Sequence, residues 1–173
     1  MNADADHRAT LSRIIDISGL KDHGAEFVIE ADDEQKKAVA ARLDVPSVKT
    51  LRGVFTMRPM RGGAAVDLRL KAELERRCVV SLEPMVETID EEISMVFDRN
   101  FVEADDDRDD DDEWREPLDG DEIDLGELLV QHLSLALDPY PRRQDADSLL
   151  DEYRSAATAS PFEALKALKK PNG

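Results

Sequence analysis

Apolar and polar residues alternate over much of the first hundred positions, and this pattern predicts a sheet. From Val66 to Leu74 every second residue is apolar and the residues between are charged. This is typical of a strand with one face in the core and the other in water. Similar but less regular strand patterns are found at 11–17, 27–29, 48–57 and 86–97. The three long strands in succession predict an antiparallel meander.

Details within these strand patterns predict where the chain turns or bends. The stretch 58–63 (RPMRGG) is expected to be a turn or loop, and 78–82 to continue the strand before it. Gly53 is a candidate bulge. Glu91 interrupts the apolar face of the last strand, which indicates a bulge or an edge strand.

The period changes to that of a helix between Asp124 and Leu137. Its apolar residues are spaced three and four apart: Leu125, Leu128, Leu129, Leu133 and Ala136. Asp124 and Glu127 have the spacing of a capping box, and Pro139 ends the helix. The wide apolar arc predicts burial against the sheet, with His132 as a core residue rather than a catalytic one. Gly126, in the first turn, costs about 1 kcal/mol against Ala, which the close approach of another backbone would explain.

Two further helices complete the predicted fold. One begins after Asp32, with Gln35 as its capping partner, and runs to about Leu43; the other begins at Ser160. The predicted class is α+β, with an antiparallel sheet of about five strands and about three helices, one of them long, buried and packed on the sheet. We expect a single domain at 1–143, a linker at 144–159 and a C-terminal docking helix at 160–170.

Charge is concentrated in one segment of the chain. The formal net charge is −17, and residues 103–122 hold 13 acidic and 2 basic residues, a net of −11. We expect this acidic loop to be solvated. The alternatives are a polyanionic arm that binds a basic partner and a Ca²⁺ or Mg²⁺ site, although the loop lacks the ligand spacing of an EF-hand. An acidic field repels RNA phosphates, so a basic ribosomal or assembly protein is the expected partner, with ribosomal RNA contacted only within a complex.

The sequence offers no recognisable catalytic set. Its three histidines, His7, His23 and His132, lie in unrelated contexts, and the single Cys78 excludes an intrachain disulfide. No catalytic residue, metal site, cofactor or small-molecule substrate is expected. There is no secretory signal or membrane-spanning apolar run, so we expect a cytoplasmic protein.

The acidic loop, its boundary with the long helix, and the residues after that helix are the candidate partner-binding regions. The candidate residues are Asp109, Asp110, Asp111, Asp112, Trp114, Asp119, Asp121, Glu122, Tyr140, Arg142, Arg143 and Phe162. Trp114 serves either to dock the loop or as a contact residue.

Three segments, taken together and in this order, resemble the YceD family of bacterial large ribosomal RNA subunit accumulation proteins. They are AELERRCVVSLEPM (72–85), DGDEIDLGELLVQHLSLALDPYPR (119–142) and SPFEALKALKK (160–170). The resemblance covers about 48–170 and implies a non-enzymatic factor that supports large-subunit (23S) ribosomal RNA accumulation and ribosome biogenesis. Many members carry a Cys-x-x-Cys motif. Here Glu75 stands at its first position and only Cys78 remains, so a zinc or redox role of that motif cannot apply.

Two other functions remain open from the residues alone. One is a metal-dependent RNA-processing enzyme that uses carboxylates around Asp119 to Asp124, because two-metal sites are built from such groups. The other is an acidic adaptor protein unrelated to ribosomes.

Overall fold

A computed structural model describes residues 11–101 and 114–146 of the 173-residue chain, and these fall into two compact units. The described residues of the first unit are 11–76, 86–101 and 114–138, and those of the second are 77–85 and 139–146. Neither α-helix in this described part is long and apolar enough to cross a membrane.

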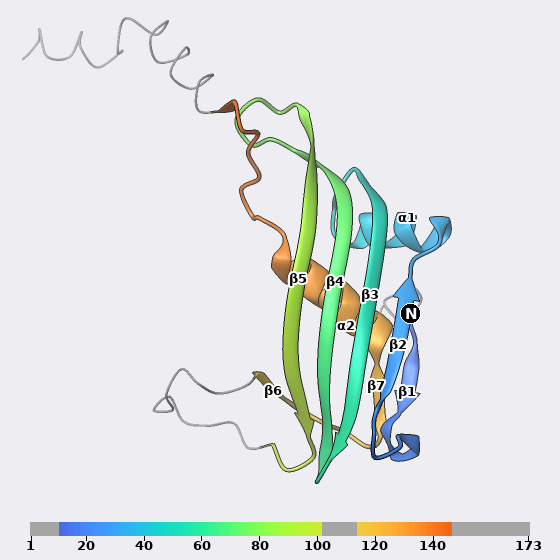
Figure 1. Ribbon diagram of the computed structural model, residues 1–173. Helices are drawn as coiled ribbons and strands as arrows, with labels where there is room; N and C mark the ends of the chain where they lie inside the picture. Colours follow the sequence, from blue (N-terminus) through green and yellow to red (C-terminus); the bar gives the residue numbers. More distant parts are fainter. Residues whose placement is uncertain (1–10, 102–113, 147–173) are drawn as a thin grey trace, which may run out of the picture. The chain divides into compact units, whose positions relative to one another are not determined.

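A five-stranded sheet in the order β2-β3-β4-β5-β6 forms the centre of the fold (Figure 1). Its strands are β2 (Ala25–Glu30), β3 (Ser47–Met60), β4 (Gly63–Arg77), β5 (Pro84–Asp98) and β6 (Trp114–Pro117). β3 pairs antiparallel with both β2 and β4, whereas β6 pairs parallel with β5. The sheet has the predicted number of strands, but β6 takes the place of the strand expected at 11–17, and the prediction of a purely antiparallel sheet is wrong. The parallel strand lies in the acidic segment, where composition had predicted only loop.

A second, two-stranded sheet joins the start of the described chain to the start of the long helix. β1 (Ile14–Asp16) pairs antiparallel with β7 (Glu122–Asp124), and the 3-10 helix η3 (Ile17–Gly19) follows β1. The strand expected at 11–17 is thus shorter than its apolar pattern. Like β6, β7 includes part of the segment that was expected to be loop.

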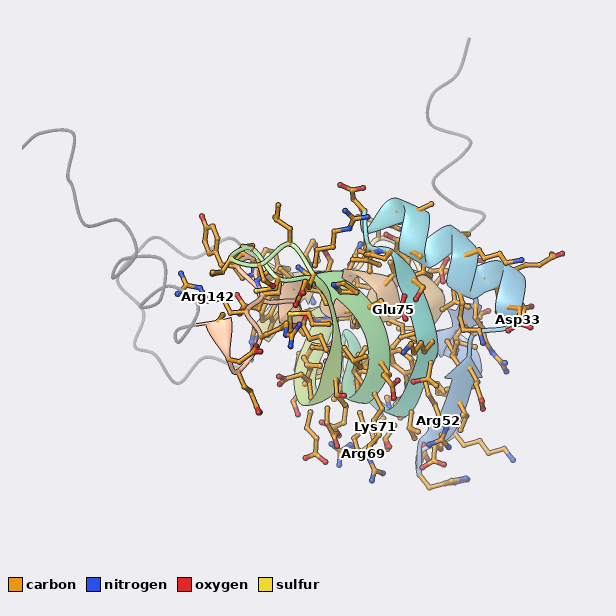
Figure 2. All side chains as sticks on the ribbon, turned by 90° about the horizontal axis from the view of Figure 1, so that it is seen from above. Asp33, Arg52, Arg69, Lys71, Glu75 and Arg142 are labelled. Atoms are coloured by element: carbon orange, nitrogen blue, oxygen red, sulfur yellow. The ribbon has the colours of Figure 1, made fainter. Side chains whose placement is uncertain are left out.

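Two α-helices lie on the same face of the five-stranded sheet, α1 (Asp33–Arg42) and α2 (Leu125–Ala136) (Figures 1 and 2). The capping box of α1 is confirmed, because Asp32 accepts from the Gln35 amide and Gln35 accepts from the Asp32 amide, each at 2.9 Å. α2 is the predicted buried helix, and its Leu129 is fully buried, as is Phe55 of β3. The helix expected at 160–170 lies outside the described residues.

α2 crosses β3 at Gly53. A Cβ atom on Gly53 would lie 2.7 Å from Cδ1 of Leu129, so a larger residue here would force this leucine to shift. The prediction of a bulge at Gly53 is wrong; the irregularity in β3 lies between Val48 and Thr50.

Two predicted connections also differ from the structure. Most of 58–63 belongs to β3 and β4, which pair up to Met60 and Gly63 and leave Arg61 and Gly62 as a tight turn. Gly62 has φ +91°, a conformation that glycine adopts without strain. Conversely, 78–82 does not continue β4. The amide of Cys78 donates to the Glu83 carbonyl at 2.9 Å, and the amide of Leu82 donates to the Cys78 carbonyl at 2.9 Å, which together close a turn.

Candidate partner-binding surface

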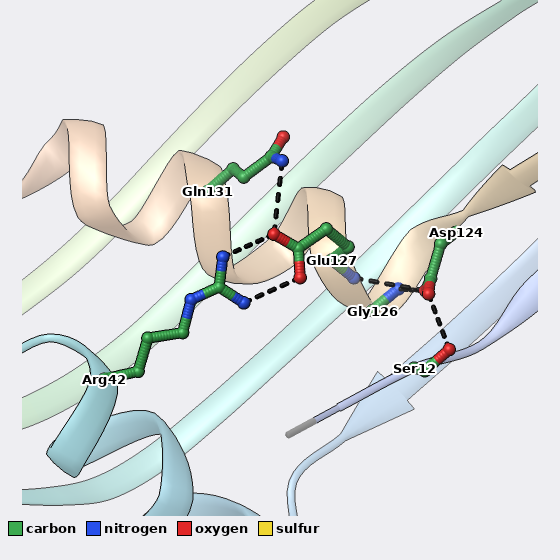
Figure 3. A network of polar contacts seen from close by, with 6 residues as sticks. All are labelled: Ser12, Arg42, Asp124, Gly126, Glu127 and Gln131. Carbon is green, nitrogen blue, oxygen red and sulfur yellow. Dashed lines mark hydrogen bonds and ion pairs between the residues drawn. The ribbon is translucent and has the colours of Figure 1, made fainter. Parts of the chain in front are cut away.

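The N-terminus of α2 is fixed by a network around Asp124 (Figure 3). One oxygen of its carboxylate accepts from the amides of Gly126 at 3.0 Å and Glu127 at 3.2 Å, which caps the helix as predicted. Its other oxygen accepts from the Ser12 hydroxyl at 2.5 Å, and the Arg13 amide donates to Asp124 at 2.8 Å. Asp124 thus attaches the start of the described chain to the helix.

Glu127 does not complete the predicted capping box. Its carboxylate instead receives both terminal nitrogens of Arg42, at the end of α1, one of them at 2.6 Å. The side-chain amide of Gln131 donates to it at 3.2 Å. The charged partner outcompetes the local backbone, because charge-assisted bidentate hydrogen bonds are stronger than neutral ones. The result is a clamp between the two helices.

The pKa values of these groups show that they are held in their charged forms. Partial burial acts to raise the pKa of Asp124, but the hydrogen bonds from Ser12, Arg13, Glu127 and Gly126 outweigh it and lower that pKa. The hydrogen bonds from Arg42 lower the pKa of Glu127, against the effect of burial. Both carboxylates stay ionised and bound to the protein's own donors. Among the residues of 11–101 and 114–146, no group of three or more His, Cys, Asp or Glu side chains has an arrangement that could hold a metal ion.

Gly126 has the close backbone neighbour that its cost in helix propensity had suggested. A Cβ atom there would lie 1.3 Å from the carbonyl oxygen of Leu11, and the Leu125 amide donates to the Arg13 carbonyl at 3.0 Å. The segment before β1 therefore lies directly on the first turn of α2.

His132 is a core residue, as predicted, with 6% of its surface exposed. Its ring meets that of Trp114 in an edge-on contact, with centroids 5.7 Å apart and planes at 67°. Burial lowers the pKa of His132, and the nearby carboxylate of Glu116 partly opposes that effect. The Trp114 indole N–H donates to Glu116 at 3.1 Å. Trp114 is still half exposed, so it packs β6 against α2 while part of its ring faces solvent.

The other candidate residues of the first unit lie just before α2 and are all exposed. Asp121 forms an ion pair with Arg99, whose Nε also donates to the Gly120 carbonyl at 3.2 Å. Asp119 is exposed, and Glu122 lies on the exposed side of β7. These side chains and that of Trp114 are exposed, and their role in partner binding stays a prediction.

Tyr140, Arg142 and Arg143 belong to the second unit. Tyr140 and Arg142 are exposed, whereas Arg143 is half buried and pairs with Glu83 and with Asp145, the latter at 2.9 Å. In the same unit Cys78 is fully buried. Hydrogen bonds from the backbone of Ser81 and Arg143 lower the pKa of its thiol to about 7.

The remaining candidates, Asp109 to Asp112 and Phe162, lie outside the described residues.

On the face of the sheet opposite the helices, no described helix covers the strands, and charges of both signs lie there (Figure 2). Arg52 and Lys71 lie directly opposite each other on β3 and β4, with Glu30 beside Arg52 on β2. On the β5 side, Lys71 pairs with Asp90 at 3.0 Å. The row therefore reads acid, base, base, acid across four strands. Arg69 points to the same side as Arg52 and Lys71 (Figure 2), and along β4 the pair Arg69 and Lys71 is bounded by Asp67 and Glu73. The positive charge is therefore a small group bordered by acids, whereas an RNA backbone requires a continuous cationic path.

One exposed feature was only partly anticipated from sequence, namely the outer edge of β5. β6 pairs with Met95 to Asp98 alone, so the stretch before it has no second neighbour among the described strands. β5 is therefore not the edge strand of the sheet, but Glu91 lies on a part of it that has no outer partner among the described strands. The sequence signal was the row Asp90-Glu91-Glu92 within an otherwise apolar strand, because charged residues are common on unpaired edges.

Comparison with known proteins identifies one family. The family model described as "Large ribosomal RNA subunit accumulation protein YceD" matches residues 66–169, which is more than half of the chain. The match spans β4, β5, β6, β7 and α2. Neither the curated proteins nor the solved structures gave a significant match.

Proposed function

The chain belongs to the YceD family of large ribosomal RNA subunit accumulation proteins, and from this premise we propose that it is a non-enzymatic factor in bacterial ribosome biogenesis. It supports accumulation of the large-subunit (23S) ribosomal RNA by binding a basic ribosomal or assembly protein. This role would be carried out in the cytoplasm, where bacterial ribosomes are assembled.

The charge distribution is the observation that carries the choice of partner. The chain has a net charge of −17, of which −11 lies within 103–122. Such a field attracts basic proteins and speeds their association, and it repels nucleic acid. The uncovered sheet face supports the same choice, because its central cations are flanked by Glu30 and Asp90.

The carboxylates near α2 support a non-enzymatic role. A nuclease of the two-metal type needs carboxylates free to bind cations. Here Asp124 caps α2 and Asp121 pairs with Arg99. Glu127, the next carboxylate along the chain, is bound by Arg42. These groups stabilise the fold around the helix.

Titration of the purified chain with individual large-subunit proteins, and separately with 23S ribosomal RNA, tests the proposal at near-physiological salt. We expect at least one basic protein to bind more tightly than the RNA does. Replacement of Asp109, Asp110, Asp111 and Asp112 by Asn should weaken that binding. The matched control replaces four exposed acids of the first unit by their amides: Asp22, Glu26, Glu30 and Glu34. Equal weakening by both sets would reduce the acidic segment to a general charge effect, and Mg²⁺-dependent RNA cleavage by the purified chain would overturn the non-enzymatic role.

A further inference from the structure

We propose that the open edge of β5, from Val86 to Ser94, is a docking site at which a basic, extended segment of the partner protein adds as a further strand of the sheet. This inference rests on the proposed function and deepens it, since it states where and how the basic partner binds.

The first argument is the unpaired backbone. β5 is one of the longest strands of the sheet, yet β6 pairs with only its last four residues, Met95 to Asp98 (Figure 1). Among the described strands of the first unit, none pairs with Val86 to Ser94 on that side. A row of free amides and carbonyls is a template for another strand, and peptides bind to many domains by such strand addition.

The second argument is the charge along this edge, which selects the partner. Asp90, Glu91 and Glu92 are all exposed. Asp90 pairs with Lys71, whereas Glu91 and Glu92 have no hydrogen bond or ion pair with any described residue. An added strand would place its side chains directly beside these carboxylates, where opposite charges are favourable and like charges are not.

The alternation of β5 also predicts the pattern of the incoming segment. Ser94 donates to Asp67 at 2.7 Å on the uncovered face, so Asp90, Glu92 and Ser94 point to that side. Ile89 and Met95 are buried on the helix side, and Ile93 is half buried there. A segment with Lys or Arg at every second position would therefore place its basic residues beside Asp90 and Glu92 on the uncovered face. Its apolar residues would lie on the helix side beside Ile89 and Ile93, with Glu91 as the one acid between them.

A synthetic peptide of alternating Lys and Val, as long as the open edge and blocked at both ends, tests the binding mode on the full chain. Alternate amides of an extended strand point to opposite edges. We therefore expect N-methylation of the residues whose amides face β5 to weaken binding at least tenfold. The peptide methylated at the other residues should bind like the parent. If both methylated peptides bind as well as the parent, attraction is by charge alone and the proposal is overturned.

Substitution of the chain locates the site. The Glu91→Gln, Glu92→Gln variant should bind the peptide at least tenfold more weakly than the wild type. The matched control, Glu26→Gln with Glu30→Gln, removes two acids from β2 at the opposite border of the sheet and should have little effect. Glu91 and Glu92 could instead serve only to prevent the β5 edges of two copies of the chain from pairing. In that case the Glu91→Gln, Glu92→Gln variant will bind the peptide as tightly as the wild type, and the proposal fails.

Amide hydrogen exchange of the full chain distinguishes this failure from failure of the proposed function. We expect the amides of 86–94 that face the open edge to exchange rapidly in the free chain and slowly when a large-subunit protein is bound. Binding of such a protein without protection of this edge would overturn the docking site and leave the proposed function intact. No binding of any large-subunit protein would overturn the proposed function itself. Protection already present in the free chain would mean that another part of the same chain covers the edge, and would also overturn the docking site.

Discussion

Replacement of Gly126 by Ala separates two physical effects that predict opposite results. Helix propensity alone predicts that Gly126→Ala stabilises the protein by about 1 kcal/mol, because Gly126 lies in the first turn of α2. The structure predicts destabilisation, since the new Cβ atom would lie 1.3 Å from the Leu11 carbonyl oxygen. A backbone atom cannot rotate away as a side chain can, so the segment before β1 must move.

The size of the loss follows from what that movement disrupts. Overpacking in a well-packed region costs about 1–3 kcal/mol. If the segment leaves the helix, the Leu125–Arg13 hydrogen bond is also lost, worth about 1 kcal/mol. The burial of Leu11, worth about 2 kcal/mol, would be lost with it. After the gain in propensity of about 1 kcal/mol is subtracted, we expect a net loss of roughly 3–5 kcal/mol.

Equilibrium unfolding in urea measures this change as a lower midpoint at an unchanged slope. Gly19→Ala is the matched control, because no atom lies within 4 Å of the position that its Cβ would occupy. We expect that variant to remain within about 0.5 kcal/mol of the wild type. A Gly126→Ala protein as stable as the wild type, or more stable, would refute the close approach of the two backbones.

Three other predictions concern α2 and its neighbours. A double-mutant cycle on Arg42 and Glu127 should give a coupling of about 1 kcal/mol, above that of a typical surface pair, because the contact is bidentate and partly buried; a coupling near zero would contradict the clamp. Because the pKa of Glu127 is lowered in the folded protein, its contribution to stability is fully present above pH 4.5, the pKa in the unfolded chain, and is lost as the pH falls through the folded pKa. The urea midpoint of Glu127→Gln should therefore fall less steeply with decreasing pH than that of the wild type. The pKa of His132 is lowered below 6.5, so the stability of the protein should decrease as the pH falls below 6.5. Protonation of His132 should also change the fluorescence emission of Trp114, the single tryptophan, which contacts the His132 ring. If His132→Gln shows the same change in emission with pH, the change has another origin.

Local sequence signals predicted the elements whose stabilising contacts lie close along the chain. The cap at Asp32 and Gln35 is one example, since both partners lie within one turn of α1. The strict alternation from Val66 to Leu74 likewise placed β4 and its buried face correctly. In each case the residues that decide the structure are the residues that form the pattern.

Elements that depend on distant partners were predicted poorly. Glu127 had a local capping role available, but Arg42 lies 85 positions away and captures it. Composition marked Trp114 to Pro117 as loop, and only pairing with β5 makes it a strand. The edge of β5 is likewise a property of the whole sheet. The charge of Glu91 within an apolar face indicated an irregular position, but the length of the unpaired stretch depends on where β6 pairs.

The parallel pairing of β5 with β6 has a consequence for how this protein can change in evolution. Met95 aligns with Trp114 and Asp98 with Pro117, so the chain must return to the start of the pairing before β6 begins. Connections between parallel strands need about a dozen residues or more. The segment between these strands therefore has a minimum length, because large deletions within it would unpair β6 and expose His132. Relatives that keep the parallel pairing of β5 with β6 should accordingly keep a connection of at least this minimum length.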